Sequence, residues 1–506
     1  MSNHLFDQIR ARMPGADAPF CELPGGEVVT YGALEARTAR YANALVALGV
    51  KPGDRVAVQV EKSFAALMVY LATVRAGGVF LPLNSAYTPN ELDYFFGDAE
   101  PTVIVCDPAK VSAIEPIAHG ARVETLDKDG AGTLAEKAAA ASPDFADVER
   151  APDDLAAILY TSGTTGRSKG AMLSHENLAS NARVLVDYWR FTAKDVLIHA
   201  LPIFHTHGLF VATNCVLFAG CSMIFRAKFD ADDVLALMNR TEKPRPTVLM
   251  GVPTFYVRLA DHAGLTREAA AHMRLFISGS APLLAETHRA FEAKSGHAIL
   301  ERYGMTEINM QTSNPYDGAR VPGTVGFALP GSAVRIADPD SGALLPPETI
   351  GMIEVAGPNV FKGYWRQPEK TKAEFRPDGF FITGDLGKID AKGYVHIVGR
   401  GKDLIITGGF NVYPKEIEGE IDALPGVNES AVIGVPHKDF GEGVTAVVVP
   451  NKGAALSEDS ILKALEGRLA KFKQPKRVII VDELPRNTMA KVQKNVLRET
   501  YKSLYQ

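Results

Sequence analysis

Apolar residues follow two alternating patterns along the first hundred residues of the chain. From 31 to 49 they recur at helical spacing, with Leu34, Ala42, Leu45 and Leu48 on one face, and Gly49 ends the segment. Short apolar runs then alternate with further helical segments. We expect strands at 55–60, 78–83 and 102–106, and helices at 64–75 and 89–97. This alternation predicts crossover units, and therefore an α/β fold of layered, mainly parallel sheets with helices.

The same alternation continues after an apolar strand predicted at 155–159. Helices are expected at 176–188 and from 208 onward, and strands at 196–200, 223–226, 248–250 and 275–277. The apolar run 209–225 is interrupted by polar residues, so it predicts core rather than a membrane span. From about 323 to 398, runs of β-branched residues separated by glycines predict a β-rich subdomain.

A charged stretch at 400–403 separates this body from the last part of the chain. Strands are expected there at 404–407, 429–435, 444–449 and 477–481, with a helix at 458–470 that Ser457 caps. We therefore predict a large domain over 1–399, a hinge at 400–403 and a small α+β domain over 404–506.

Composition and charge narrow the possible partners. The 506 residues are 46% hydrophobic and 22% charged, which is ordinary for a globular protein of several folding units. A net charge of −5 disfavours nucleic acid and a basic membrane-binding patch. The four cysteines lack metal-binding spacing, and no apolar leader segment is visible. We expect a cytoplasmic protein without nucleic-acid or membrane partners.

The stretch from Tyr160 to Gly170 carries the first candidate chemistry. It follows the predicted strand at 155–159 and consists largely of Gly, Ser and Thr. Backbone N–H groups and hydroxyls of such a loop suit a phosphate chain, and Lys169 adds a point charge. The spacing between Gly163 and Lys169 does not match the P-loop of nucleotide triphosphatases. The loop therefore predicts a triphosphate site of another kind.

This loop and four later motifs together resemble the signatures of the adenylate-forming superfamily, which includes acyl-CoA synthetases, peptide-synthetase adenylation domains and luciferases. The later motifs are Glu301–Glu307, Thr383–Asp385, Gly399–Asp403 and Pro485–Lys491. They occur in the family order and span most of the chain. The resemblance implies a large domain with a small mobile one, ATP, Mg²⁺ and coenzyme A, and an acyl-adenylate intermediate.

The resemblance also implies roles for individual residues around the nucleotide. The ATP-binding set is Thr161, Ser162, Gly163, Thr164, Thr165, Lys169, Gly279, Ser280, Ala281, Glu301, Arg302, Tyr303, Gly304, Asp385 and Arg400. Within it, Tyr303 stacks on adenine, and Asp385 and Arg400 hold the ribose. Thr306 touches the α-phosphate, Glu307 is the Mg²⁺ ligand, and His205 joins them among the catalytic residues.

Lys491 corresponds to the catalytic lysine of the family, and Lys402 occupies the hinge position. In the family, a rotation at the hinge replaces this lysine by a loop for thioester formation, here Gly408 and Gly409, which bind coenzyme A. The family usually has glycine before the lysine, whereas this chain has Ala490; alanine costs about 1 kcal/mol if the position needs a positive φ. In some members of the family acetylation of this lysine switches the enzyme off, so a protein acetyltransferase is a candidate partner at Lys491.

Arginines near the substrate motifs indicate which acid is used. Arg302 precedes Tyr303, and Arg258 follows the stretch 252–256, with His207 and Ser280 in motifs expected nearby. A buried guanidinium needs an anionic partner. Because adenylation consumes one carboxylate, a second must face the arginines, which predicts a short dicarboxylate. The alternative is that Arg302 pairs with a structural glutamate.

Three motifs, at 204–208, 301–307 and 310–316, resemble in their residues the malonyl-CoA synthetase branch of the superfamily, whose usual substrates are malonate and methylmalonate. The sequence does not decide between these two acids. An enzyme for another short carboxylic acid, or one that loads a carrier protein, would share the adenylation motifs, so both alternatives stay open.

Overall fold

The computed structural model describes residues 3–161, 168–407, 410–466, 468–469, 471–487 and 491–505. The chain forms two compact units: Met1–Ala333 with Val355–Phe381, and Val334–Glu354 with Ile382–Gln506. Strands that the sequence assigned to the large domain, such as β19 (Val395–Arg400), thus group with the C-terminal residues. The predicted boundaries and the hinge stay predictions. Helices and mainly parallel sheets confirm the α/β class.

The first sheet of unit 1 has the strand order β6-β5-β3-β4-β7-β8. Its strands are β3 (Arg55–Gln59), β4 (Val79–Pro82), β5 (Val103–Cys106), β6 (Arg122–Thr125), β7 (Leu155–Thr161) and β8 (Lys169–Ser174). All pairs are parallel except the last, β7 with β8. Helix α2 (Tyr31–Ala47) precedes β3, and the crossover helices are α3 (Phe64–Arg75) and α4 (Pro89–Ala99), all close to the predicted ranges. The described ends of the phosphate-loop stretch, Tyr160–Thr161 and Lys169–Gly170, therefore lie in two paired antiparallel strands.

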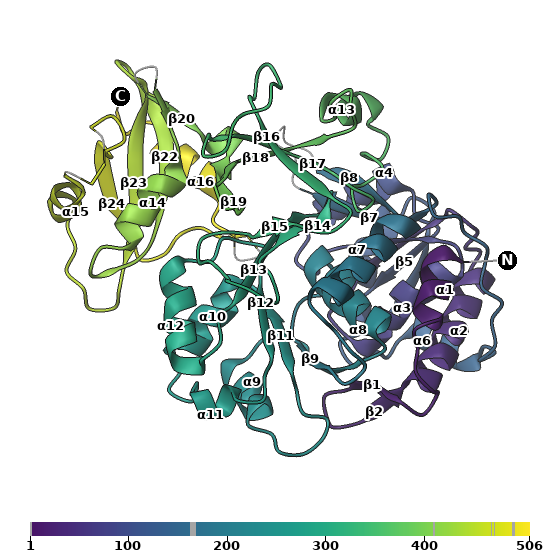
Figure 1. The fold of residues 1–506 in the computed structure, drawn as a ribbon. Coiled ribbons are helices and arrows are strands. Elements are labelled where there is room, and N and C mark those ends of the chain that lie inside the picture. Colours follow the sequence, from purple (N-terminus) through teal and green to yellow (C-terminus); the bar gives the residue numbers. More distant parts are fainter. Residues whose placement is uncertain are drawn as a thin grey trace. The chain divides into compact units, whose positions relative to one another are not determined.

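The second sheet of unit 1 has the order β15-β14-β13-β12-β11-β9-β10-β1-β2 (Figure 1). The strands are β1 (Pro19–Glu22), β2 (Val28–Thr30), β9 (Val196–His199), β10 (Ser222–Phe225), β11 (Val248–Gly251), β12 (Leu275–Ser278), β13 (Leu300–Met305), β14 (Asn309–Ser313) and β15 (Phe327–Ala328). Pairing is parallel from β13 to β1 and antiparallel at both ends. Residues of β9 to β12 are buried, because helices cover the sheet.

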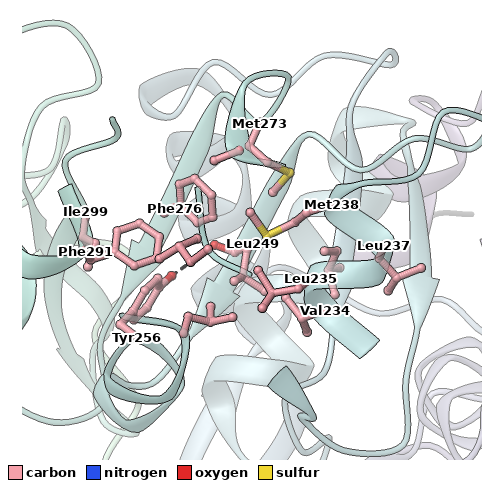
Figure 2. Packing of buried hydrophobic residues seen from close by; sticks show 14 of the residues in the cluster. Val234, Leu235, Leu237, Met238, Leu249, Tyr256, Met273, Phe276, Phe291 and Ile299 are labelled. Carbon is pink, nitrogen blue, oxygen red and sulfur yellow. Dashed lines mark hydrogen bonds between the residues drawn. The ribbon is translucent and has the colours of Figure 1, made fainter. Parts of the chain in front are cut away.

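Three helices pack their apolar faces on this sheet: α9 (Ala231–Met238), α10 (Pro253–Asp261) and α12 (Ala285–Ser295). Figure 2 shows Tyr256 of α10 and Phe291 of α12 beside Phe276 of the sheet. The Tyr256 hydroxyl donates a hydrogen bond of 2.6 Å to Ile277 O, so this large ring is buried with its polar atom satisfied. The packing fixes which face of α10 points to the sheet and leaves Arg258 exposed.

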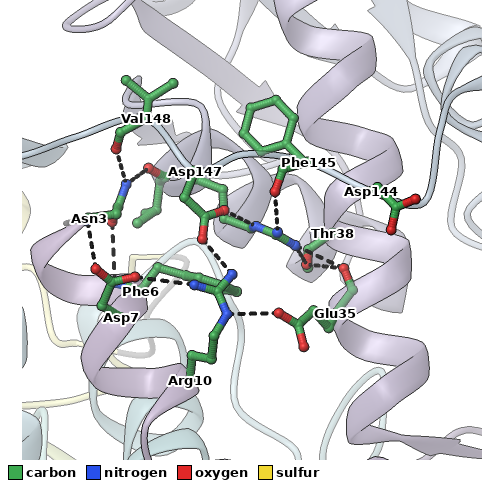
Figure 3. A network of polar contacts seen from close by, with 12 residues as sticks. Asn3, Phe6, Asp7, Arg10, Glu35, Thr38, Asp144, Phe145, Asp147 and Val148 are labelled. Atoms are coloured by element: carbon green, nitrogen blue, oxygen red, sulfur yellow. Dashed lines mark hydrogen bonds and ion pairs between the residues drawn. The ribbon is translucent and has the colours of Figure 1, made fainter. Parts of the chain in front are cut away.

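A buried polar network ties the segment 145–148 to the N-terminal helices (Figure 3). Arg75 is 2% exposed, and its Nε lies 2.5 Å from Asp147 Oδ1. Asp147 also pairs with Arg10 of α1 (His4–Arg10). Asn3 donates through Nδ2 to Val74 O at 2.8 Å and to Val148 O at 2.9 Å. Polar contacts, rather than an apolar stripe, therefore hold a segment in which the sequence predicted no element.

Unit 2 contains a sheet of order β16-β17-β18-β19 and a second sheet of order β21-β20-β23-β22, with β24 paired to β23. The remaining strands are β16 (Ala333–Ala337), β17 (Gly351–Ala356), β18 (Phe381–Ile389), β20 (Ile405–Thr407), β21 (Phe410–Val412), β22 (Val427–His437), β23 (Gly441–Pro450) and β24 (Arg477–Ile480). Ser457 caps α15 (Glu458–Leu465) as predicted, but the helix ends earlier than expected. The sequence missed α14 (Pro414–Asp422) and α16 (Lys494–Tyr501).

The apolar run 209–225, which the sequence predicts to be core, is buried in the structure. It forms a π-helix at His207–Thr213, α8 (Asn214–Ala219) and strand β10, and nearly all of its side chains are buried. Among the described residues, no helix is both long and apolar enough to cross a membrane.

Candidate active site

The hairpin of β13 and β14 places the motif from Glu301 to Glu307. Strand β13 pairs with β12 on one side and with β14 on the other, and the turn between β13 and β14 carries Thr306 and Glu307. Gly304 is required here because a Cβ at this position would lie 1.8 Å from Asn309 O. Glu307 is 4% exposed, and its carbonyl accepts from Phe361 N at 2.8 Å. The turn thus holds a carboxylate in a buried, defined place.

The Glu307 carboxylate is linked to both ends of the β7–β8 hairpin. Its Oε1 accepts from Thr161 Oγ1 at 3.2 Å and lies 3.1 Å from the Tyr364 hydroxyl. That hydroxyl donates to Glu374 Oε2 at 2.7 Å, and Glu374 Oε1 pairs with Lys169 Nζ at 3.1 Å. Burial, and then the charge of Glu307, raise the pKa of Tyr364 well above its ordinary value. Tyr364 therefore stays protonated, and its single hydroxyl proton lies between these two acids, closer to Glu374.

Thr161 and Lys169 were expected to bind phosphate, and the structure brings both to Glu307 and its partners. They are cross-strand neighbours in the β7–β8 pair, and Lys169 Nζ also lies 4.0 Å from the centroid of the Tyr364 ring. Sequence reasoning missed Tyr364 and Glu374, which lie outside every motif. Ser162, Gly163, Thr164 and Thr165 fall outside the described residues.

A second polar group surrounds Arg302 of β13. Its side chain is 3% exposed, and the backbone of Gly279 lies against the guanidinium, where a Cβ would come within 2.3 Å of Cζ. Its Nε and Nη2 have no hydrogen-bond acceptor among the described residues. Burial lowers the pKa of Arg302 to about 9. The expected alternative, a structural glutamate partner, is not found in the described part of the chain.

His207 lies beside this guanidinium. It is 2% exposed, and its Nδ1 is 3.2 Å from Ser280 Oγ, whereas its Nε2 contacts no polar partner in the described chain. Burial, and then the charge of Arg302, lower the pKa of His207 well below its ordinary value. Ser280 has φ +72°, a value that residues other than glycine rarely adopt and that often marks functional sites. The structure thus gathers three predicted acid-binding residues.

Arg258 does not join them in this structure, and its assignment to the acid stays a prediction. It is exposed on α10, whereas Tyr256 on the same helix is buried against the sheet. Two positions correspond to about 200° around a helix, so the two side chains point to opposite faces. Tyr256 and Cys215, rather than Arg258, come close enough to Arg302 to affect its pKa.

The other predicted residues of unit 1 lie around these two groups. Glu301 is buried, and its Oε1 accepts from Leu283 N at 3.2 Å. His205 accepts through Nδ1 from His207 N at 3.3 Å. Tyr303, opposite Thr312 in the β13–β14 hairpin, is partly exposed, as are Thr306 and Ala281.

In unit 2 the structure pairs two residues that the sequence assigned to the ribose. Asp385 and Arg400 are direct cross-strand neighbours in β18 and β19, and Arg400 Nε lies 2.8 Å from Asp385 Oδ1. Lys402 is exposed in the short 3₁₀ helix Gly401–Asp403. The backbone of Lys491 exchanges hydrogen bonds with Asn487, with Lys491 N donating to Asn487 Oδ1 at 3.0 Å. Gly408, Gly409 and Ala490 fall outside the described residues.

Two family models match the chain. The model of the AMP-binding enzymes matches residues 6–365, and that of the AMP-binding enzyme C-terminal domain matches 416–491. A feruloyl-CoA synthase from an Amycolatopsis species is 39% identical, covering 94% of this chain and 95% of its own. A mitochondrial malonate–CoA ligase from Mus musculus is 36% identical, covering 94% and 87%. ATP-bound MatB from Rhodopseudomonas palustris is 67% identical, covers 100% of both chains, and superposes with a TM-score of 0.97.

Proposed function

Because the chain belongs to the family of AMP-binding enzymes, we propose that it is an ATP-dependent malonate–CoA ligase. One carboxylate of malonate attacks the α-phosphorus of ATP, and pyrophosphate leaves. The thiol sulfur of coenzyme A then attacks the carbonyl carbon of the adenylate, its proton is released, and AMP leaves. The products are malonyl-CoA, AMP and pyrophosphate. Methylmalonate, which adds one methyl group, is the expected second substrate.

The buried guanidinium of Arg302 carries this proposal. Two of its nitrogens are without acceptors in the described chain, and Nε2 of His207 beside it is also without a partner. A carboxylate is the natural ligand for such donors, because charge-assisted hydrogen bonds to a planar guanidinium are short and strong. The second carboxylate of malonate, which does not react, supplies that anion. A monocarboxylic acid would leave the buried donors unpaired.

Glu307 fits the Mg²⁺ ligand that the reaction needs. Mg²⁺ prefers oxygen ligands and is commonly held by one or two carboxylates together with phosphates. Glu307 provides a buried carboxylate whose orientation is fixed by Thr161 and Tyr364. When bound there, the ion neutralises charge on the phosphates of ATP. We assign Thr306 and Tyr303, which share the hairpin, to the α-phosphate and the adenine.

Lys169 completes the phosphate side of the proposal. In the protein its ammonium is held between Glu374 and the Tyr364 ring, next to the end of the loop stretch. When ATP binds, its phosphate oxygens compete with Glu374 for this ammonium. Glu374 therefore orients Lys169 in the free enzyme without preventing its contact with phosphate.

Residues of unit 2 complete the proposed enzyme. We assign the ribose to Asp385 and Arg400, which already form one ion pair, and adenylation to Lys491. The Gly408–Gly409 loop is assigned to coenzyme A, and Lys402 to the hinge. Lys491 is partly exposed, which would give a protein acetyltransferase access to it. These assignments rest on the family motifs.

AMP release tests the proposal directly. The enzyme is incubated with ATP, Mg²⁺ and coenzyme A, together with acetate, malonate, methylmalonate, succinate, octanoate, benzoate or ferulate. We expect malonate-dependent AMP formation that also requires coenzyme A, and the methylmalonate ratio measures the room beside the central carbon. Preference for a monocarboxylate would overturn the role of Arg302. If turnover occurs only with a phosphopantetheinyl carrier protein, that protein rather than coenzyme A is the acyl acceptor.

A further inference from the structure

The ammonium group of Lys62, just beyond strand β3, has no carboxylate partner in the described chain. Its Nζ donates to His199 O at 2.8 Å and to Arg226 O at 2.7 Å, and lies 3.0 Å from His199 Nδ1. The same group lies 4.3 Å from the centroid of the Phe225 ring. Burial lowers the pKa of Lys62 well below its ordinary value. An ammonium removed from water without a counter-charge disfavours folding relative to an apolar side chain of similar size.

Hydrogen-bond counting fixes the tautomer of His199, the last residue of β9. The Gly208 carbonyl beside Nε2 can only accept, so Nε2 carries the proton and Nδ1 accepts from Lys62 Nζ. That Nε2 lies 2.9 Å from Gly208 O and 3.1 Å from Thr213 Oγ1. With the opposite tautomer, two lone pairs would face each other at Gly208 O. Lys62 therefore keeps His199 in the form that holds this carbonyl.

Gly208 directly follows His207 at the start of the π-helix His207–Thr213. Its carbonyl also accepts from Thr213 Oγ1 at 3.0 Å, and a Cβ at this position would lie 2.1 Å from Pro202 O. Such close packing leaves little room for the turn to adjust. A shift of the Gly208 carbonyl would therefore move the neighbouring His207, and π-helical segments are often found at functional sites.

We propose that Lys62 and His199 are positioning residues for the acid site, which hold His207 in place through the carbonyl of Gly208. Neither residue touches malonate in this arrangement, and neither belongs to the group that surrounds Glu307. The inference rests on the proposed function, because His207 is assigned there to the unreacted carboxylate of malonate.

Lys62→Met tests the inference, because it removes the ammonium and keeps the length of the side chain. We expect the KM for malonate to rise about tenfold, equivalent to 1.4 kcal/mol, while the KM for ATP changes less than about twofold. The melting temperature is measured alongside, because the substitution also leaves the carbonyls of His199 and Arg226 without this donor. Lys110→Met is the matched control: Lys110 Nζ donates to Ser85 O at 2.6 Å but does not contact His199. This control should leave both KM values unchanged.

His199→Gln provides the rescue experiment. A glutamine amide has a permanent N–H donor near the position of Nε2, so it holds the Gly208 carbonyl without tautomer control. We expect His199→Gln to retain a near-normal KM for malonate and His199→Leu to raise it. In the His199→Gln background, Lys62→Met should change this KM less than about twofold, so the two substitutions are not additive.

Three results with the variants would overturn the inference. A parallel rise in the KM for ATP would show a general structural role, and an unchanged KM for malonate in Lys62→Met would show no role. Full additivity of the two substitutions would exclude action through His199. A wild-type enzyme that turns over other acids but not malonate would instead overturn the proposed function, and this inference with it.

Discussion

Replacing Arg302 by methionine separates the recognition of malonate from the handling of ATP. Methionine keeps much of the length and volume of the side chain but removes every donor. The guanidinium that it replaces is buried, lies against Gly279, and has two nitrogens without acceptors in the described chain. Glu307 and its partners Thr161 and Tyr364 form a separate hydrogen-bonded group. The substitution should therefore act on the acid and leave the nucleotide largely unaffected.

The expected size of the effect follows from the burial of the Arg302 side chain. Removing one partner of a buried, hydrogen-bonded charge pair costs about 2–5 kcal/mol. Since each 1.4 kcal/mol is a factor of ten, kcat/KM for malonate should fall about thirtyfold to a few thousandfold. Stability should change in the opposite direction. Burial lowers the pKa of Arg302 to about 9, so the free enzyme bears the cost of a desolvated cation that methionine does not have.

Two measurements check this prediction. A pyrophosphate-coupled assay gives kcat/KM for malonate and the KM for ATP, and thermal unfolding gives Tm with and without malonate. We expect malonate to raise Tm of the wild type but not of Arg302→Met, whose own Tm is equal or higher. Arg258→Met is the comparison variant: because Arg258 is exposed, we expect no change in either assay, and a loss of malonate turnover would instead support its assignment to the acid. Malonate turnover within about threefold of wild type would refute the role of Arg302.

Three further predictions concern other parts of the molecule. Asp147→Asn leaves the buried Arg75 without its ion pair and should lower the free energy of unfolding by about 3–5 kcal/mol in a urea titration. Burial raises the pKa of Asp422 to about 6 from 3.8, so stability falls as pH rises through this range, and Asp422→Asn should stabilise by about 1–3 kcal/mol at pH 8 and by less toward pH 5. Glu307→Gln should raise the Mg²⁺ concentration needed for half-maximal rate without raising the KM for malonate; an unchanged Mg²⁺ dependence would contradict its assignment.

Most of the large unit could be predicted because its strands are buried on both faces. Segments such as β5, β11 and β12 are short apolar runs bounded by turn residues, which is typical of parallel sheets covered by helices. The two helices of unit 2 that escaped prediction, α14 and α16, are polar. In α16 only Leu497 is buried, so its apolar periodicity is too weak to recognise, and α14 has only a few buried positions. The segment 145–148 is held by ion pairs that leave no periodic pattern.

The candidate site could likewise be predicted only in part. Motifs led to Arg302, His207 and Glu307, but the residues that orient them come from distant parts of the chain. Tyr364 lies 57 positions from Glu307, and Lys62 lies 137 positions from His199. Pairings of this kind carry no local signal, because only the folded sheet brings them together. Arg258 illustrates the complementary case: its neighbours in sequence suggested the site, whereas Tyr256 packs on the sheet and Arg258, two positions later on the helix, is exposed.

Overall identity does not decide which acid is used, since a feruloyl-CoA synthase and a malonate–CoA ligase match this chain at 39% and 36%. The choice lies in the few side chains around the acid. An aromatic acid would cover the unpartnered nitrogens of Arg302 and His207 with carbon, and each buried donor left unpaired costs about 1–3 kcal/mol. Counting only the two Arg302 nitrogens, kcat/KM for ferulate should be about thirtyfold to twenty-thousandfold below that for malonate. Arg302→Met should narrow this ratio by lowering the malonate value. Comparable values for the two acids in the wild type would show that the buried guanidinium does not select the substrate.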